Sequence, residues 1–302
     1  MTKLSHLGEF GLIESLKKFQ NLLPRVVKGI GDDAAVLKVK GGRYLLFTTD
    51  MLVQDVHFSL RMSARAVGHK ALACNLSDIA AMGGEPVFAV VSLGVPGNMS
   101  TRYVKDLYAG MWTVARAFGV SIVGGDTVRS DKVVVNVALL GEVEKRKLIR
   151  RQGARTGDWI FVSGHLGGAL KSGRHLKFTP RVKEARFLVN NFKPSAMMDL
   201  SDGLAGDLAH ILKASCVGAL LEEKLIPRHR GVTVERALTD GEDFELLFTM
   251  PSARAKKLLE YEGPEKFRFC PIGVVRPRRE GFCIVRASGQ VEAVEAKGYR
   301  HF

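Results

Sequence analysis

The chain has 302 residues, of which 46% are hydrophobic and 25% are charged, and its formal net charge is +14. These proportions are typical of a folded globular protein and exclude a disordered or fibrous chain, and the length favours two domains. Apolar runs fall short of the ~20 residues of a membrane-spanning helix, and the first residues lack the apolar core of a secretory signal. We therefore expect a cytoplasmic protein without membrane contact.

The first half of the chain alternates helical and strand-like segments. Apolar residues at helical spacing predict an amphipathic helix over residues 9–20. Strands are then expected at 34–39, 44–49, 87–93, 120–123 and 133–140, and helices at 63–82 and 101–118. This order predicts one sheet covered by helices.

A basic segment at residues 145–151, followed by glycines, predicts a hinge. Beyond it a second set of elements begins. The expected strands are 159–162, 217–222, 244–250, 268–275 and 282–286, and the expected helices are 180–191, 202–215 and 252–262. The fold class is therefore α/β (α+β), with an N-terminal domain at 1–147 and a C-terminal α/β domain at 148–302.

The positive charge is spread over the whole length, and its densest run, 145–151, contains no aromatic residue. Nucleic-acid binding would favour a basic patch with interleaved aromatics, so a solvated basic surface that helps to recruit anionic substrates is the better interpretation. The cysteines are too far apart for a zinc site and are expected to be small buried residues. They are Cys74, Cys216, Cys270 and Cys283.

Aspartates stand beside glycine, serine or threonine in five short segments. These are Gly31-Asp32-Asp33, Thr48-Thr49-Asp50, Ser77-Asp78, Gly124-Gly125-Asp126 and Asp199-Leu200-Ser201-Asp202. Mg²⁺ prefers oxygen ligands and commonly bridges carboxylates to substrate phosphates. Each segment alone also fits a turn, an exposed helical stripe or, at Ser201 or Asp202, a helix N-cap. Together they indicate phosphate chemistry with magnesium.

The pair Gly124-Gly125 follows a short apolar segment, so its amides could cradle a phosphate while Asp126 faces a cation. The chain has neither the Walker lysine pattern nor a Gly-x-Gly-x-x-Gly at a strand-to-helix junction. A nucleotide site in this chain would therefore be of a different kind from a P-loop or a dinucleotide fold.

The aspartate segments and several others, in this order, resemble the thiamine-monophosphate kinase family, and the match extends from Gly8 to Phe302. The matching segments are Gly-Ile-Gly-Asp-Asp at 29–33, Thr-Thr-Asp-Met-Leu-Val-Gln-Asp-Val-His-Phe at 48–58, Lys-Ala-Leu-Ala-Cys-Asn-Leu-Ser-Asp-Ile-Ala-Ala-Met-Gly at 70–83, Gly-Gly-Asp-Thr at 124–127, Gly-Asp-Trp-Ile at 157–160, Asp-Leu-Ser-Asp-Gly-Leu at 199–204, Gly-Glu-Asp-Phe-Glu-Leu at 241–246 and Lys-Gly-Tyr-Arg-His-Phe at 297–302.

This resemblance implies the fold of aminoimidazole ribonucleotide synthetase, with an N-terminal ATP-binding domain that forms a homodimer. It also implies transfer of the γ-phosphoryl group of ATP to thiamine monophosphate, giving thiamine diphosphate, with several Mg²⁺ ions. The implied magnesium ligands are Asp33, Thr48, Thr49, Asp50, Asp78, Asp126, Asp199 and Asp202. The implied ATP contacts are Gly125, Asp126, Arg151 and Ser201, and the implied substrate contacts are His57, Glu242 and Tyr299.

The implied reaction is chemically consistent with these residues. A phosphate monoester has a second pKa near ~6, so the acceptor is largely dianionic at neutral pH and needs no general base. We accordingly expect no catalytic acid or base, and only metal ions and cations that align two polyanions. Tyr299 and Glu242 suit a cationic thiazolium ring.

Two departures from the family pattern concern the substrate side. Gln54-Asp55 replaces the pair usual before Val-His-Phe, and Arg150-Arg151 leaves the aligned arginine ambiguous by one position. Two other functions are considered. One is another ATP-dependent enzyme of the superfamily, such as an aminoimidazole ribonucleotide synthetase. The other is a non-catalytic nucleotide- or nucleic-acid-binding protein.

Overall fold

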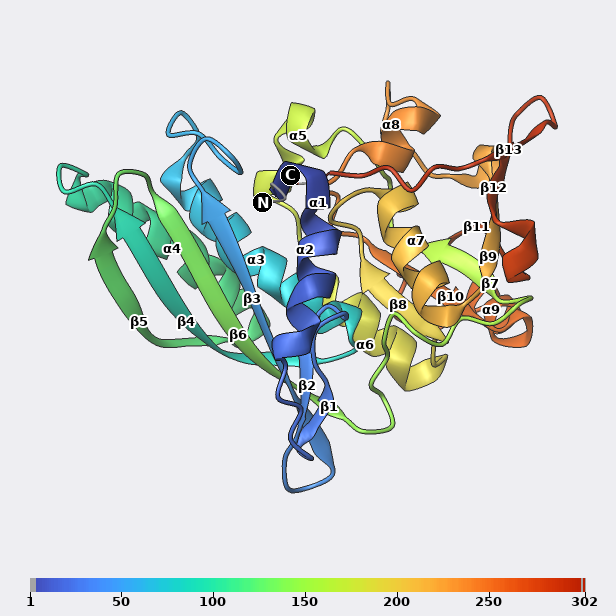
Figure 1. Ribbon diagram of the computed structural model, residues 1–302, viewed down its shortest axis with the longest axis horizontal. Helices are drawn as coiled ribbons and strands as arrows, with labels where there is room; N and C mark the ends of the chain where they lie inside the picture. The colour runs from blue at the N-terminus through green and yellow to red at the C-terminus, as the bar shows by residue number, and fades with distance from the viewer. Residues whose placement is uncertain (1–3, 300, 302) are drawn as a thin grey trace.

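The computed structural model describes residues 4–299 and 301 and contains two sheets that lie side by side, one in each half of the chain (Figure 1). This confirms the expected α/β (α+β) class. The first sheet ends at Glu144 and the second begins at Trp159. The sheets thus fall on either side of the expected domain boundary, whose exact position at 147/148 stays a prediction.

Helices and strands alternate along the chain. The α-helices are α1 (Leu4–Leu7), α2 (Glu9–Leu16), α3 (Ala64–Ala81), α4 (Thr101–Phe118), α5 (Ala169–Ser172), α6 (Val182–Asn191), α7 (Leu204–Ser215), α8 (Val234–Thr239) and α9 (Ser252–Leu259). The strands are β1 (Val26–Lys28), β2 (Ala35–Lys38), β3 (Arg43–Val53), β4 (Glu85–Val95), β5 (Ser121–Arg129), β6 (Val134–Glu144), β7 (Trp159–Val162), β8 (Ala196–Asp199), β9 (Gly218–Glu222), β10 (Leu246–Met250), β11 (Cys270–Arg276), β12 (Phe282–Val285) and β13 (Val291–Ala293).

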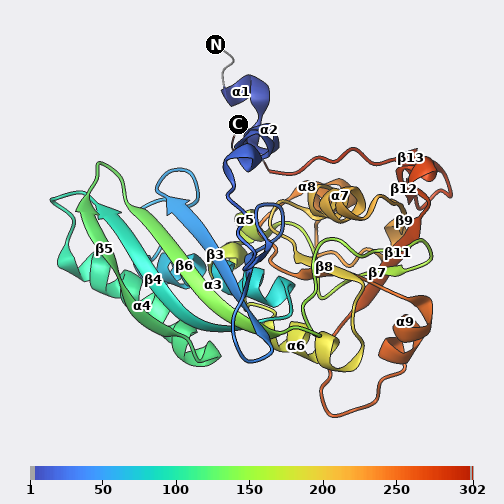
Figure 2. The ribbon, with the colours of Figure 1, turned by 60° about the horizontal axis from the view of Figure 1, so that its bottom comes forward.

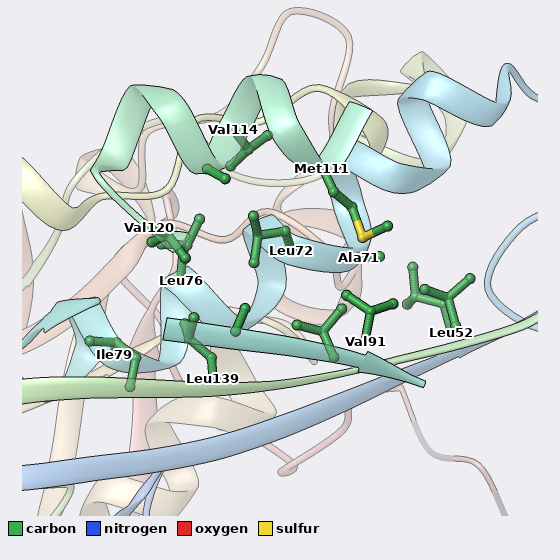
Figure 3. Close-up of a cluster of buried hydrophobic side chains, with 14 of the residues drawn as sticks. Leu52, Ala71, Leu72, Leu76, Ile79, Val91, Met111, Val114, Val120 and Leu139 are labelled. Atoms are coloured by element: carbon green, nitrogen blue, oxygen red, sulfur yellow. The ribbon is translucent and has the colours of Figure 1, made fainter. Parts of the chain in front are cut away.

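The first sheet has six strands in the order β1-β2-β3-β6-β4-β5, and α3 and α4 cover one of its faces (Figure 1). Burial alternates strictly along β6, as expected for a sheet with one packed and one open face. Leu72 and Leu76 of α3 lie between Leu139 of the sheet and Met111 of α4 in the core (Figure 3).

Helix α3 is buried along most of its length, because it contacts both halves of the molecule. Its neighbours are α4, β3 and β6 in the first half and α6 and β8 in the second. A helix enclosed in this way is apolar around most of its circumference, as the run from Ala71 to Ala81 is. The polar residues that α3 carries are therefore placed in the interior of the protein.

The second sheet has seven strands in the order β13-β12-β9-β11-β7-β10-β8. Two apolar clusters pack against it, one around Leu208 of α7 and one around Phe161 and Phe248. The N-terminal helices and the C-terminal segment meet beside the junction of the two halves (Figure 2). There the backbone N–H of His301 donates to Glu9 at 3.0 Å.

Several expected elements differ from the observed ones. The opening helix ends at Leu16 and continues as a 3-10 turn, and the strand expected at 120–123 continues to Arg129. The short elements α1, β1, α5, β8, α8 and β13 were not expected. Cys74 is buried as expected, but Cys216 is exposed, and Cys270 and Cys283 are only partly buried. None of the helices within the described residues is long and apolar enough to cross a membrane.

Candidate active site

A cleft of about 1180 Å³ lies where the two halves of the chain meet. Its walls come from the loop before β2, from β3 and α3 of the first half, and from β8, α7 and the loop before β10 of the second half. Helix α2 and the C-terminal segment line it as well. Most of the acidic residues expected at the site are found here.

Three carboxylates from three separate elements converge in this cleft. Asp33 lies in the loop before β2, Asp78 on α3 and Asp199 at the end of β8, and one oxygen of each lies within 4.8 Å of the others. We call these residues the carboxylate cluster. Because Asp199 comes from the second sheet, the cluster exists only when both halves are in contact.

Hydrogen bonds orient the carboxylate cluster. The Thr48 hydroxyl donates to Asp78 Oδ2 at 2.5 Å and also lies 3.2 Å from the backbone carbonyl of Asp33. The Arg151 guanidinium donates to Asp33 Oδ1 at 2.6 Å. The other oxygen, Asp33 Oδ2, is buried and accepts no hydrogen bond from the residues that the structure describes. An unsatisfied buried carboxylate oxygen of this kind is suited to a metal ion.

The carboxylate cluster is electrostatically costly without a cation. Burial and the neighbouring Asp50 raise the pKa of Asp78 well above its usual range. Burial and Asp33 raise the pKa of Asp199 to about 7. The pKa of Asp50 rises to about 6, mainly through burial and then through Glu242. A divalent cation would offset this repulsion and stabilise the ionised forms.

Asp202 and Ser201 also line the cleft, next to Asp199. The alternative that one of them caps α7 is wrong, since Gly203 occupies the N-cap position. The Asp207 carboxylate instead accepts from the backbone N–H groups of Asp202, at 3.0 Å, and of Gly203, at 3.1 Å. Burial raises the pKa of Asp202 to about 6.

Thr49 differs from its neighbours on β3, although it too borders the cleft. Side chains alternate along a strand, so Thr48 and Asp50 face α3 while Thr49 faces the open side of the sheet. Its hydroxyl lies 3.0 Å from Asn136 Oδ1 and 3.1 Å from the carbonyl of Val137. The Thr49 side chain therefore points away from the carboxylate cluster.

Gly125 and Asp126 lie outside the cleft of this chain. The expectation that the glycines follow a strand is wrong, because β5 runs through them. Gly125 permits close strand packing instead, since a Cβ there would lie 1.8 Å from the Val91 carbonyl. Asp126 pairs with Ser92, whose side chain is on the open face, so Asp126 lies on that face at the sheet edge.

The expected substrate residues His57, Glu242 and Tyr299 all line the cleft. The Val53 N–H donates to His57 Nδ1 at 3.0 Å, which fixes the ring. The His301 ring lies 5.1 Å from that of His57 and 5.0 Å from that of Tyr299, measured between centroids. These three rings form an aromatic wall near Glu242.

Arg151 is the member of the arginine pair that enters the cleft, through its contacts with Asp33 and with Asp32. The loop that carries Gln54 and Asp55 is fixed at both residues. Gln54 accepts from the Val133 N–H at 3.1 Å, and Asp55 adopts a positive φ of 65°. The departure from the family pattern at these positions thus makes a well-defined turn.

The cleft also contains residues that sequence reasoning missed, among them Glu9, Lys70 and Asp207. Lys70 could have been found from its spacing, because Lys70, Cys74 and Asp78 recur every four residues and so share one face of α3. Glu9 and Asp207 stand in no comparable pattern. Glu9 accepts from the backbone N–H of His301, which is far away in the sequence, and Asp207 accepts from the backbone N–H groups just before α7.

Three comparisons with known proteins bear on this site. A family model described as "AIR synthase related protein, N-terminal domain" matches residues 31–143. A thiamine-monophosphate kinase of Bacillus subtilis (strain 168) is 36% identical, over 98% of this chain and 100% of the relative. One of Aquifex aeolicus (strain VF5) is 34% identical, over 99% and 100%.

A solved structure described as "AaThiL complexed with AMPPCP and TMP" superimposes on the chain with a TM-score of 0.88. It is 33% identical and covers 100% of this chain and 99% of its own. With relatives aligned from end to end at these identities, the chain belongs to the thiamine-monophosphate kinase family, which is the family that its motifs resemble.

Proposed function

We propose that this protein transfers the γ-phosphoryl group of ATP to thiamine monophosphate, giving thiamine diphosphate and ADP. The observation that carries this proposal is the carboxylate cluster between the two halves, in a chain similar over its full length to proteins of that name. The similar solved structure holds AMPPCP and TMP, which supports ATP and thiamine monophosphate as the two substrates.

Mg²⁺ fits the donor set of the cleft, which consists of oxygen atoms. Asp33, Asp78 and Asp199 would hold it, with Asp50 and Asp202 as further ligands from the same walls. The hydroxyl of Thr48 is engaged by Asp78, so its proposed part is to orient that carboxylate. The bound ion would supply charge neutralisation and alignment of phosphoryl oxygens.

The residues of the chain perform positioning rather than acid or base catalysis. Arg151 orients the Asp33 carboxylate through its hydrogen bond to Oδ1, and it also offers a cation near the nucleotide phosphates. Ser201 lies two residues after Asp199 and lines the cleft, and it is proposed to contact ATP. The acceptor phosphate attacks as a dianion, so no side chain needs to remove a proton.

The organic part of the acceptor is proposed to bind at His57, Glu242 and Tyr299. The aromatic faces of Tyr299 and His57 can stack on its rings, and the Glu242 carboxylate can pair with the thiazolium charge. The acceptor would then extend from this wall toward the carboxylate cluster, where its phosphate meets the γ-phosphoryl group.

We also propose a homodimer formed through the open face of the first sheet. Large apolar side chains are exposed there, including Phe47, Met51, Phe88 and Val90. An exposed apolar face of this kind marks an association surface. Asp126 lies on the same face, and we propose that it and Gly125 act at the site of the partner subunit. For an enzyme that consumes ATP we infer a cytoplasmic location.

The test is turnover by the purified protein with ATP, MgCl2 and either thiamine monophosphate or thiamine, with thiamine diphosphate detected by chromatography. The expected result is thiamine diphosphate from the monophosphate alone, and none when EDTA removes the magnesium. Failure to form thiamine diphosphate at any magnesium concentration would overturn the proposed function.

A further inference from the structure

A lysine ammonium is buried in the wall of the cleft. Lys70 is 1% exposed and is among the largest fully buried side chains of the described residues. The other lysines lining the cleft, Lys17, Lys28 and Lys213, are at partly or fully exposed positions. Burying an ammonium group is unfavourable unless anionic groups surround it.

Lys70 makes one ion-pair contact, which leaves most of its hydrogen-bonding capacity unused. Its Nζ lies 2.5 Å from Glu242 Oε2, and no other group within the described part of the chain accepts a hydrogen bond from it. An ammonium has three N–H donors. Lys70 lines the cleft and therefore keeps N–H donors that no described protein group accepts, as an anionic ligand would require.

The position of Lys70 on α3 indicates which anionic ligand its ammonium would bind. Lys70 and Asp78 lie eight residues apart on one helix face, so about 12 Å of helix axis separates their Cα atoms, and the long Lys70 side chain spans part of that distance. Arg151, the partly buried cation that contacts the cluster, is already engaged by Asp33. Lys70 thus lies against Glu242 on the face of α3 that leads to Asp78, close enough to Asp50 and His57 for its charge to act on both.

Glu242 is held in a conformation that costs backbone energy. Its φ is 69°, and that of the nearby Phe244 is 50°, in the left-handed region that residues other than glycine rarely adopt. Such strain persists where the surroundings impose it and is concentrated at binding sites. The strained loop places the Glu242 carboxylate against Lys70.

On the basis of the proposed function, we propose that Lys70 binds the phosphate group of the acceptor and that acceptor binding exchanges one ion pair for two. The Lys70–Glu242 pair of the free protein separates. Lys70 then pairs with the acceptor phosphate, and Glu242 pairs with the organic cation of the same molecule. The cleft thereby selects phosphate monoesters that carry a cation.

The test compares binding of thiamine monophosphate and thiamine to the full-length protein by calorimetry. The wild type is expected to bind the monophosphate more tightly. In Lys70→Met the ratio of the two dissociation constants should shrink at least tenfold, while thiamine binds as tightly as before or more tightly. The KM for thiamine monophosphate should rise at least tenfold, and the KM for ATP less than twofold.

Lys224→Met removes the same charge from an exposed position outside the cleft and should leave the ratio unchanged. An unchanged ratio in Lys70→Met, or an equal loss for both ligands, would overturn the inference. If that variant does not fold, Glu242→Gln serves instead. It should weaken thiamine binding more than monophosphate binding, because Lys70 remains, and an equal loss would again count against the inference.

The inference and the proposed function fail separately. A wild type that produces thiamine diphosphate while Lys70→Met keeps the wild-type ratio would contradict only the role of Lys70. A wild type that produces no thiamine diphosphate would contradict the proposed function itself.

Discussion

Replacing Asp78 with asparagine removes one charge from the carboxylate cluster and keeps the shape of the side chain. Like charges 4.8 Å apart repel by about 3.5 kcal/mol at an effective dielectric constant of ~20. The raised pKa of Asp78 means that protonation already relieves part of this repulsion. Without metal, the free energy of unfolding of Asp78→Asn should therefore exceed that of the wild type by between zero and about 3.5 kcal/mol.

The same variant should lose its response to magnesium. A wild type at a hundred times its dissociation constant for Mg²⁺ gains about 2.7 kcal/mol. Asp78→Asn should gain little at that concentration, and its kcat should fall at least ~100-fold, which corresponds to about 2.7 kcal/mol of barrier. Urea denaturation with and without MgCl2 measures the first effect, and steady-state turnover measures the second.

The reasoning would be refuted if folded Asp78→Asn kept both the magnesium-dependent stabilisation and near-normal turnover. A variant that is strongly destabilised without metal would also contradict it. In that case the carboxylate would be serving mainly as the acceptor of the Thr48 hydroxyl and not as a repelling member of the cluster.

Three further predictions concern packing, association and pH. Gly125→Ala should destabilise the protein by ~2 kcal/mol or more, because its Cβ would overlap the backbone of β4. Gly124→Ala has open space at its Cβ and should not be destabilised. Equal melting temperatures of the two variants would refute this prediction. Val90→Glu, on the open sheet face, should convert dimers to monomers in analytical ultracentrifugation. Trp112→Glu, on the exposed side of α4, should leave the dimer intact. A dimer in both variants would place the interface elsewhere. The carboxyl of Asp199 has a pKa of about 7 in the folded protein, above its unfolded value, so the folded state binds more protons between pH ~4 and ~7. Without metal, the stability that Asp199 contributes should fall as pH rises through that range. The gain in melting temperature from Mg²⁺ should therefore be larger at pH 8 than at pH 5.5. A gain independent of pH would contradict the assignment of Asp199 as a metal ligand.

Much of the cluster could be predicted because its residues stand in local patterns. Asp33 follows glycines at a turn, and Asp78 interrupts an apolar helical run where a charge needs a partner. The order of these segments also identified the family. What the pattern of residues could not show was that three distant elements bring their oxygens to within 4.8 Å.

The failures arose where long-range packing overrides local signals. Two consecutive glycines favour a loop, yet β4 continues alongside and pairs with β5 through Gly124 and Gly125. Strand β8 is short and fully buried, so it shows no alternation that would distinguish it from other apolar segments. The burial of Lys70 depends on α3 being enclosed by both halves, which no local pattern reveals.

The central claim is that phosphoryl transfer occurs at the carboxylate cluster between the two halves. Its most direct test is a crystal structure with Mn²⁺, a non-hydrolysable ATP analogue and thiamine monophosphate, in which anomalous scattering locates the metal. The account predicts metal bound by Asp33, Asp78 and Asp199, with the γ-phosphate of the analogue and the acceptor phosphate both at that metal. Metal and nucleotide bound elsewhere, for instance in the hollow between α4 and β5 beside Trp112, would contradict it.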